Sequence, residues 1–142
     1  MSSSKLAQNG FTLIEVMVGV AIIGVLVAIL IPNYMRYTAK SKVSGGLAEL
    51  TALKPAVEEF VASSVGSFSL SDLGGSSNTS NCTMSLVASS GVVALSCTLV
   101  NPVYLIAGGV VSLVRSSEGI WTCEVNSNIS QDFAPLGCTV FN

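Results

Sequence analysis

An apolar run near the N-terminus constrains this chain more than any other feature of its sequence. The run holds the 21 residues from Phe11 to Ile31, and Glu15 is the only charged residue among them. At about 1.5 Å of rise per residue, a helix of this length spans the hydrocarbon core of a bilayer, which is about 30 Å thick. A charged side chain inside such a span costs about 2.5–3.5 kcal/mol at the centre on insertion scales. Glu15 therefore needs a compensating partner.

The composition of the chain argues against several classes of function. Only 10% of the 142 residues are charged, against about 25% in ordinary soluble domains, so we expect other protein to cover much of the surface. The net charge is −2, and the cluster of Lys and Arg that binds nucleic acid is missing. The absence of histidine, of a Gly-rich phosphate loop and of a G-x-S-x-G motif argues against an enzyme. We expect no cofactor and no metal ion.

Four cysteines, Cys82, Cys97, Cys123 and Cys138, all lie beyond the apolar run. An even number in a small domain rich in Ser and Gly predicts two disulfides and an oxidising compartment. The spacing does not match the paired C-x-x-C pattern of a zinc site. Four cysteines allow three connectivities.

A β-hairpin is predicted where two strand-like segments flank the turn Ala88–Gly91. In the expected register Val87 faces Val92, and the same register places Cys82 opposite Cys97. Directly opposed residues have Cα atoms about 4.5–5.5 Å apart, within reach of a disulfide. We therefore expect a Cys82–Cys97 bridge.

Two further strands are expected at Val103–Val114 and Ile120–Val125, which gives an antiparallel sheet of about four strands. The segment from Ser63 to Asn81 is rich in Ser, Gly and Asn and is predicted to be a surface loop. Residues 63–142 then form a disulfide-stapled β-sheet domain.

The residues before this domain predict a helix that continues past the apolar run. Pro32 removes one backbone donor and kinks the helix without necessarily ending it. In residues 33–62 apolar side chains recur at helical spacing, which predicts an amphipathic helix whose apolar stripe packs on the sheet. Gly45-Gly46 and Pro55 both weaken the prediction of a continuous helix. The stripe consists of Val43, Leu47, Leu50, Val57 and Val61.

The residues that open the apolar run, Gly10-Phe11-Thr12-Leu13-Ile14-Glu15, resemble the prepilin cleavage motif of type IV pilins and their relatives. The resemblance implies that residues 1–10 are a class III leader and that a prepilin peptidase cuts after Gly10 on the cytoplasmic side. The same enzyme would methylate Phe11, the new N-terminus. The resemblance also implies that Glu15 neutralises the N-terminal ammonium of a neighbouring subunit during assembly. By hydropathy alone, the run fits a plain signal anchor, with Glu15 reaching toward the interface.

The charges that flank this span predict one orientation in the membrane, and the cysteines and the cleavage motif predict the opposite one. Arg36, Lys40 and Lys42 follow the run and outnumber Lys5 and the initiating amine before it, which would place the C-terminal side in the cytoplasm. The cysteines need an oxidising space, and the cleavage motif implies a cytoplasmic leader. We give these two observations more weight and expect the C-terminal domain in the periplasm.

The resemblance extends to the C-terminus and to a complete expected function. Cys123 and Cys138 resemble the bounds of the disulfide loop that ends many type IVa pilins, where the loop is a staple, a subunit contact or an exposed adhesion site. Like many pilins, the chain has a proline at Pro32. We therefore expect an α+β type IV pilin fold, with residues 11–32 as the transmembrane and assembly helix.

The function that the resemblance implies is that of a structural subunit of a type IV pilus. The chain would pass from the inner membrane into an extracellular, retractable homo-oligomeric filament for adhesion, twitching motility and DNA uptake. Prepilin peptidase, an assembly platform and ATPases would be its partners. The alternatives are a minor pilin, a DNA-uptake receptor, which would need a basic stripe, or a type II secretion pseudopilin, which typically uses calcium where this chain has cysteines.

Overall fold

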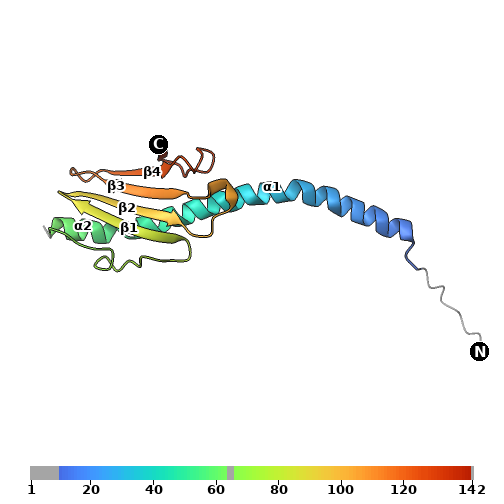
Figure 1. Cartoon of the computed structure of the whole chain (residues 1–142), viewed down its shortest axis with the longest axis horizontal. Coiled ribbons are helices and arrows are strands. Elements are labelled where there is room, and N and C mark those ends of the chain that lie inside the picture. Colours follow the sequence, from blue (N-terminus) through green and yellow to red (C-terminus); the bar gives the residue numbers. More distant parts are fainter. Residues whose placement is uncertain (1–9, 64–65, 142) are drawn as a thin grey trace, which may run out of the picture. The chain divides into compact units, whose positions relative to one another are not determined.

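The computed structural model describes residues 10–63 and 66–141. The chain divides into two compact units, the first ending at Tyr34 and the second beginning at Met35. We call residues 10–34 the N-terminal segment and residues 35–141 the head, and describe each by itself (Figure 1). Apart from Gly10, the predicted leader lies outside the described residues.

Two consecutive helices replace the single amphipathic helix expected for residues 33–62. Helix α1 runs from Leu13 to Ala52 and includes Pro32 and Gly45-Gly46 without interruption. Helix α2 runs from Lys54 to Ala62, and Pro55 lies in its first turn. Proline fits there because the N–H that it lacks would have no partner inside the helix. Pro55 therefore marks the start of a new helix, and α1 ends just before it.

The head contains a five-stranded sheet in the order β1-β2-β3-β4-β5. Its strands are β1 (Cys82–Ser89), β2 (Val92–Leu99), β3 (Val110–Arg115), β4 (Trp121–Asn126) and β5 (Cys138–Phe141). The first four strands pair antiparallel, as the sequence predicts, whereas β5 pairs parallel to β4. The fifth strand was not expected from the sequence, because its four residues are too few to show a period.

The hairpin between β1 and β2 has a different register from the predicted one. Ser89 pairs with Val92 across a two-residue turn, in which Ser90 and Gly91 have φ angles of 50° and 81°. Positive φ at both central residues is the geometry of the tight turns that match the twist of a hairpin. The expected four-residue turn was wrong, and Cys82 lies opposite Leu99 instead of Cys97.

The strand expected over Val103–Val114 is also shorter than predicted. A short 3-10 helix, η1, covers Tyr104–Ile106, and β3 begins only at Val110. Gly108 separates the two with a φ of 70°, a conformation that glycine adopts at little cost. The apolar pattern continues through this turn because Ile106 is itself fully buried.

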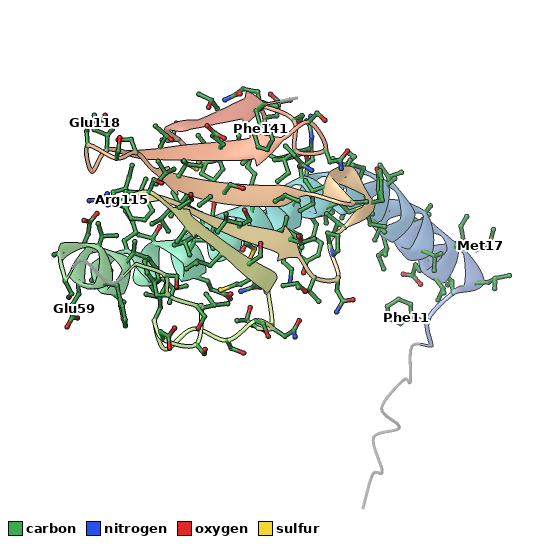
Figure 2. All side chains as sticks on the ribbon, turned by 60° about the vertical axis from the view of Figure 1, so that its left-hand side comes forward. Phe11, Met17, Glu59, Arg115, Glu118 and Phe141 are labelled. Carbon is green, nitrogen blue, oxygen red and sulfur yellow. A yellow bond between two sulfur atoms is a disulfide. The ribbon has the colours of Figure 1, made fainter. Side chains whose placement is uncertain are left out.

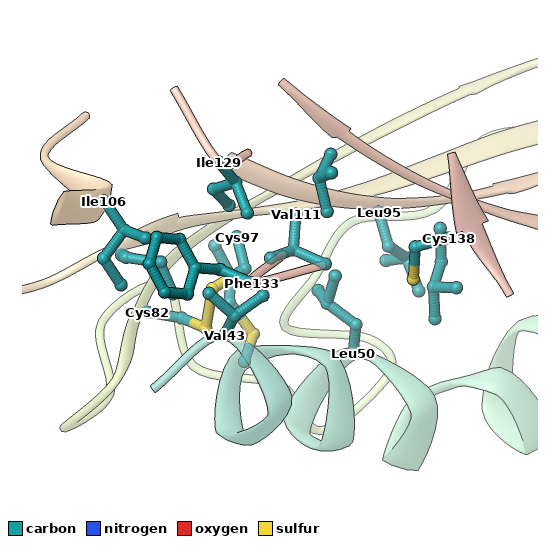
Figure 3. Packing of buried hydrophobic residues seen from close by; sticks show 14 of the residues in the cluster. Val43, Leu50, Cys82, Leu95, Cys97, Ile106, Val111, Ile129, Phe133 and Cys138 are labelled. Carbon is teal, nitrogen blue, oxygen red and sulfur yellow. A yellow bond between two sulfur atoms is a disulfide. The ribbon is translucent and has the colours of Figure 1, made fainter. Parts of the chain in front are cut away.

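The core lies between the helices and one face of the sheet (Figure 3). Val43, Leu50 and Val57 are completely buried, and Leu47 and Val61 are half-buried against the same cluster, so the predicted stripe is confirmed. The sheet contributes completely buried side chains from β1 to β4. These are Cys82, Leu95, Cys97, Val111 and Val125.

Candidate functional site

The N-terminal segment is an apolar surface that the described chain leaves uncovered. None of its residues belongs to the buried core, and the side chains of Phe11 and Leu13 are 85% and 81% exposed. Figure 2 shows Phe11 and Met17 extending away from the ribbon. Monomeric soluble proteins rarely expose apolar patches of more than a few hundred Å², and larger ones mark protein or membrane contacts. Among the described residues, one helical stretch is long and apolar enough to cross a membrane.

Glu15 and Thr12 form a reciprocal cap at the start of α1. The Thr12 N–H and hydroxyl donate to Glu15 Oε2 at 2.8 and 2.7 Å, and the Glu15 N–H donates to Thr12 Oγ1 at 3.3 Å. This is a capping box, in which each side chain satisfies a backbone donor that the first turn leaves unpaired. The cap lies one residue beyond Phe11. Among the described residues no hydrogen bond reaches Glu15 Oε1, so this oxygen can accept another donor.

Pro32 leaves one gap in the hydrogen-bond ladder of α1. Proline has no N–H to donate to the carbonyl four residues earlier, that of Ala28. The side chain of the next residue supports the following carbonyl, because Asn33 Nδ2 donates to Ile29 O at 3.2 Å. The helix passes through this weakened turn unbroken.

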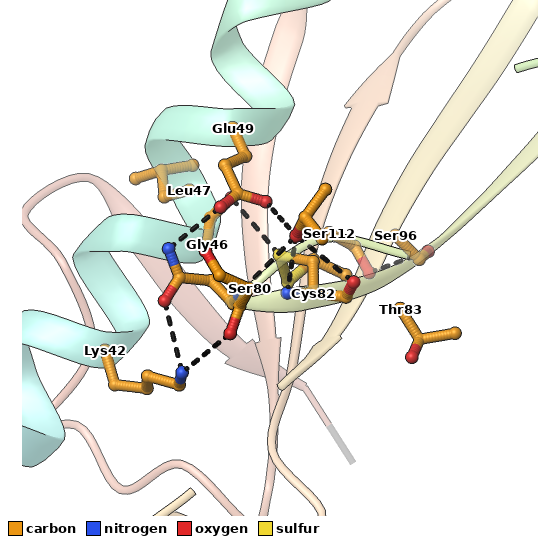
Figure 4. Close-up of a disulfide and its surroundings, with 12 residues drawn as sticks. Lys42, Gly46, Leu47, Glu49, Ser80, Cys82, Thr83, Ser96 and Ser112 are labelled. Atoms are coloured by element: carbon orange, nitrogen blue, oxygen red, sulfur yellow. Dashed lines mark hydrogen bonds between the residues drawn. A yellow bond between two sulfur atoms is a disulfide. The ribbon is translucent and has the colours of Figure 1, made fainter. Parts of the chain in front are cut away.

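The first disulfide joins Cys82 to Cys97 next to Gly46 of α1 (Figure 4). The two cysteines are diagonal neighbours on the same face of the hairpin, with Cα atoms 5.1 Å apart. The helix contacts the disulfide at Gly46, where an added Cβ would lie 2.9 Å from Cys97 Sγ and 3.1 Å from Leu99 Cδ2. Gly46 therefore permits the close approach of α1 to the sheet.

Polar side chains of α1 hold the loop that precedes β1 (Figure 4). Glu49 accepts hydrogen bonds from Thr79 Oγ1 at 2.6 Å and from Asn81 Nδ2 at 2.8 Å. Lys42 Nζ donates to Ser80 O at 3.2 Å and to Asn81 Oδ1 at 3.1 Å. Sequence reasoning missed this clamp, since nothing in the spacing of Lys42 and Glu49 indicates which loop they hold.

The second disulfide joins Cys123 on β4 to Cys138 on β5. The two residues are directly opposite in the parallel pair, and their Cα atoms are 4.4 Å apart. A hollow of about 410 Å³ lies beside this bridge, lined in part by Trp121, Lys54 and Leu136. The side chain of Leu136, in the loop closed by the disulfide, is fully exposed.

A network of hydrogen bonds around one ion pair joins α2 to strands β3 and β4. Arg115 Nε and Nη2 donate to the two oxygens of Glu58 at 2.9 and 3.0 Å, and Trp121 Nε1 donates to Glu58 Oε1 at 2.7 Å. The hydrogen bonds from Arg115, and then that from Trp121, hold the pKa of the Glu58 carboxyl below its ordinary value. Lys54 Nζ lies 4.9 Å from the centre of the Trp121 ring.

These contacts divide the predicted site residues into separate groups. Glu15 lies beside Thr12 and one turn from Phe11, and the four cysteines form two disulfides inside the head. Among the described residues, no three His, Cys, Asp or Glu side chains are placed so that they could hold a metal ion. The N-terminal segment provides an exposed apolar surface for contacts, and the head is a domain braced by two disulfides.

Comparison with known proteins agrees with this architecture. The family described as pilin, a bacterial filament protein, matches residues 39–139, and a prokaryotic N-terminal methylation motif matches residues 5–31. A fimbrial protein of Pseudomonas aeruginosa is 36% identical over 93% of this chain and 97% of its own length. A type IV major alpha-pilin of Moraxella bovis is 37% identical over the same shares of the two chains.

A solved structure supports the fold independently of close sequence similarity. The crystal structure of a Cs1 pilin chimera matches with a TM-score of 0.60 and 22% identity, over 73% of this chain and 98% of that one. The pilin family match lies in the head, the methylation motif covers most of the N-terminal segment, and each of the two relatives matches 93% of the chain. The chain therefore belongs to the pilin family of bacterial filament proteins.

Proposed function

We propose that this chain is a major subunit of a type IV pilus, made as a prepilin and cut between Gly10 and Phe11. Prepilin peptidase would remove residues 1–10 and methylate the amine of Phe11. The mature chain would wait in the inner membrane, with the apolar helix in the bilayer and the head in the periplasm, before it enters an extracellular filament. The family match and the name of the Moraxella bovis relative support this proposal.

The observation that carries the proposal is an exposed apolar helix with a carboxylate at its start, of which only one oxygen accepts hydrogen bonds from the described residues. Glu15 Oε2 holds the cap of its own helix through Thr12, whereas Oε1 can accept another donor. A carboxylate in an apolar assembly is tolerable only when it is paired and hydrogen-bonded. In the filament, the Phe11 ammonium of a neighbouring subunit would supply that pair.

Leader cleavage would act as the switch for this pairing. Before the cut, a peptide bond joins Phe11 to Gly10, and after the cut Phe11 carries a free amine four residues from Glu15. Moving apolar helices from lipid to protein gains no exclusion of water, so assembly would depend on packing and on such polar contacts. A near balance of this kind suits a filament that both extends and retracts.

The remaining parts of the proposal concern partners and biological role. An assembly platform and ATPases would move subunits into and out of the filament, which would serve adhesion, twitching motility and DNA uptake. A minor pilin or a pseudopilin of type II secretion remains the alternative. Two disulfides in the head and the names of the pilus relatives favour a pilus subunit over a pseudopilin.

Two measurements on cells test this function. Shearing should release filaments in which this protein dominates, with a mass that corresponds to a chain beginning at N-methylated Phe11. Glu15→Ala should still be cut and should remain in the membrane, but should yield few or no filaments. Glu15→Asp is the matched control, because it keeps the negative charge on a side chain that is one methylene shorter. Normal filaments from Glu15→Ala would refute the pairing role, and a sheared fraction made of another pilin would indicate a minor subunit.

A further inference from the structure

The basic residues that follow the apolar run form a distinct patch on the head. Three of the five cations in residues 35–141 fall between Arg36 and Lys42, and no Asp or Glu occurs between Glu15 and Glu49. The seven acidic residues of the head all lie from Glu49 onward. The chain therefore changes from strongly basic to acidic within a few turns of α1.

Two of these cations are exposed, and the third donates hydrogen bonds within the head. The side chain of Arg36 is 63% exposed, and Lys40 is also exposed, one turn further along the same helix face. Tyr37 lies between them and is 73% exposed. Lys42 instead donates to the loop at Ser80 and Asn81. Arg36, Tyr37 and Lys40 are the collar that we consider below.

The collar lies where the headgroups of a membrane would be, if the apolar run spans the bilayer as proposed above. Along a helix, Arg36 is about 7.5 Å and Lys40 about 13.5 Å beyond Ile31, and the headgroup layer is roughly 5–8 Å thick on each side. The flexible side chain of Lys40 can reach back toward that layer. Tyrosine is enriched at the same depth, because its ring is apolar and its hydroxyl is polar.

The head also has a hollow beside these cations. Arg36, Lys40, Asp132 and Phe133 line a cavity of about 300 Å³. The only acidic group in that lining is Asp132, whose Oδ2 lies 4.0 Å from Arg36 Nη2, with both side chains largely exposed. An exposed ion pair at this distance contributes little, so a lipid phosphate can replace the carboxylate at Arg36.

We propose that the collar binds the anionic phospholipid headgroups of the membrane leaflet that faces the head. Arg36 and Lys40 would contact the phosphates, and Tyr37 would lie among the headgroups. The more acidic remainder of the head would be repelled by the same surface, so the binding would hold the stored subunit at a fixed depth and orientation. This function also explains cations on the side of the span where the positive-inside rule does not place them.

The proposal is tested by native mass spectrometry of the full-length processed chain. The protein is released from detergent micelles that contain equal amounts of phosphatidylglycerol and phosphatidylcholine, and the retained lipids are counted. We expect preferential retention of phosphatidylglycerol. Lys40→Gln and Arg36→Gln should each reduce that preference about fivefold, whereas Arg36→Lys should largely keep it. Asp132→Asn, which removes the competing carboxylate, should increase it.

Lys54→Gln is the matched control, because it removes the same charge from the head far along the chain from the apolar run. Equal retention of the two lipids by the unmodified chain, or an equal loss in Lys54→Gln, would overturn the proposal. So would complete displacement of phosphatidylglycerol by inorganic phosphate at constant ionic strength, which would indicate a general anion site. Unchanged lipid retention with lost filaments in Lys40→Gln would assign the cations to a subunit contact instead. Circular dichroism confirms that each variant is folded.

The lipid measurement is independent of filament formation. If the unmodified chain is absent from sheared filaments, the proposed pilus function fails while lipid retention can still be measured. If the chain forms filaments and shows no lipid preference, only the collar proposal fails. The two failures are therefore distinguishable.

Discussion

Gly46 offers the sharpest test of how the head is packed, because its neighbour Gly45 is a matched control. Both glycines lie inside α1, so alanine at either position gains the same helix propensity, about 1 kcal/mol. At Gly45 the added Cβ would lie 3.4 Å from Asn81 Nδ2, an ordinary contact. At Gly46 it would lie 2.9 Å from Cys97 Sγ and 3.4 Å from Cys82 Sγ.

The clash at Gly46 cannot be relieved by rotating one side chain. Cys97 Sγ is bonded to Cys82 Sγ, and both cysteines are completely buried, so either α1 or the hairpin must move. Overpacking of a well-packed core costs about 1–3 kcal/mol. Gly45→Ala should therefore stabilise the head by up to about 1 kcal/mol, and Gly46→Ala should be about 1–3 kcal/mol less stable than Gly45→Ala.

Urea denaturation of the full-length chain in detergent micelles measures this difference, with Trp121, the single tryptophan, as the fluorescent probe. A Cys82→Ala/Cys97→Ala background removes both sulfur atoms, so the gap between the two glycine variants should shrink there, as expected for coupled neighbours. Equal stability of Gly45→Ala and Gly46→Ala in the oxidised chain would refute the close approach. An unchanged gap without the sulfurs would show that the disulfide is not its cause.

Three further predictions concern the head. The folded state holds the Glu58 pKa below its ordinary value of 4.5, so the unfolded chain binds more protons in acid, and stability should fall as the pH drops through that folded pKa; Glu58→Gln should flatten this part of a plot of urea midpoint against pH. Replacing Cys123 and Cys138 by Ser should lower the free energy of unfolding by about 3 kcal/mol, and an unchanged urea midpoint would contradict a staple. A chain that begins at Met35 should keep the head folded, since the buried core starts at Ala39, and circular dichroism on heating should show a cooperative transition.

The helical part of the fold was predictable because its apolar residues follow a regular pattern over many turns. In the apolar run Glu15 is the only charged residue. In the head, by contrast, Ala39, Val43, Gly46 and Leu50 follow one another at spacings of four and three residues in the buried face of α1. Such spacing fixes the face that packs on the sheet. The break at Leu53 was harder to predict, because Pro55 fits both a kink and a first turn.

The register of the hairpin shows how a correct disulfide can follow from a wrong pairing. The expected register differs from the observed one by two residues, and side chains alternate with period two. Cys82 and Cys97 therefore keep the same face in both registers and become diagonal neighbours in the observed one. The positive φ of Ser90 decides the turn, and a serine gives little sign of it in a sequence.

The contacts that brace the head could not be predicted from the sequence, because they join residues far apart in it. Glu58 and Arg115 are separated by 57 positions, and Asn81 contacts Glu49 across 32. This chain has few charged residues, and those that brace the head each have two or more partners. They are Lys42, Glu49, Glu58 and Arg115. Composition indicates that such groups are few, and only the fold shows which ones meet.

One helix, α1, thus combines an exposed apolar part with a part that packs in the head. The part of α1 in the head is held by a buried stripe, by Gly46 against a disulfide and by the Lys42–Glu49 clamp. Among the described residues, the part in the N-terminal segment has no buried side chain, and Glu15 and Asn33 make polar contacts within it. Since the head is stabilised within itself, the pilus subunit that we propose would exchange lipid for other subunits at its apolar surface without loss of the head's stability. Such independence suits a subunit that, as proposed, is stored, assembled and withdrawn intact.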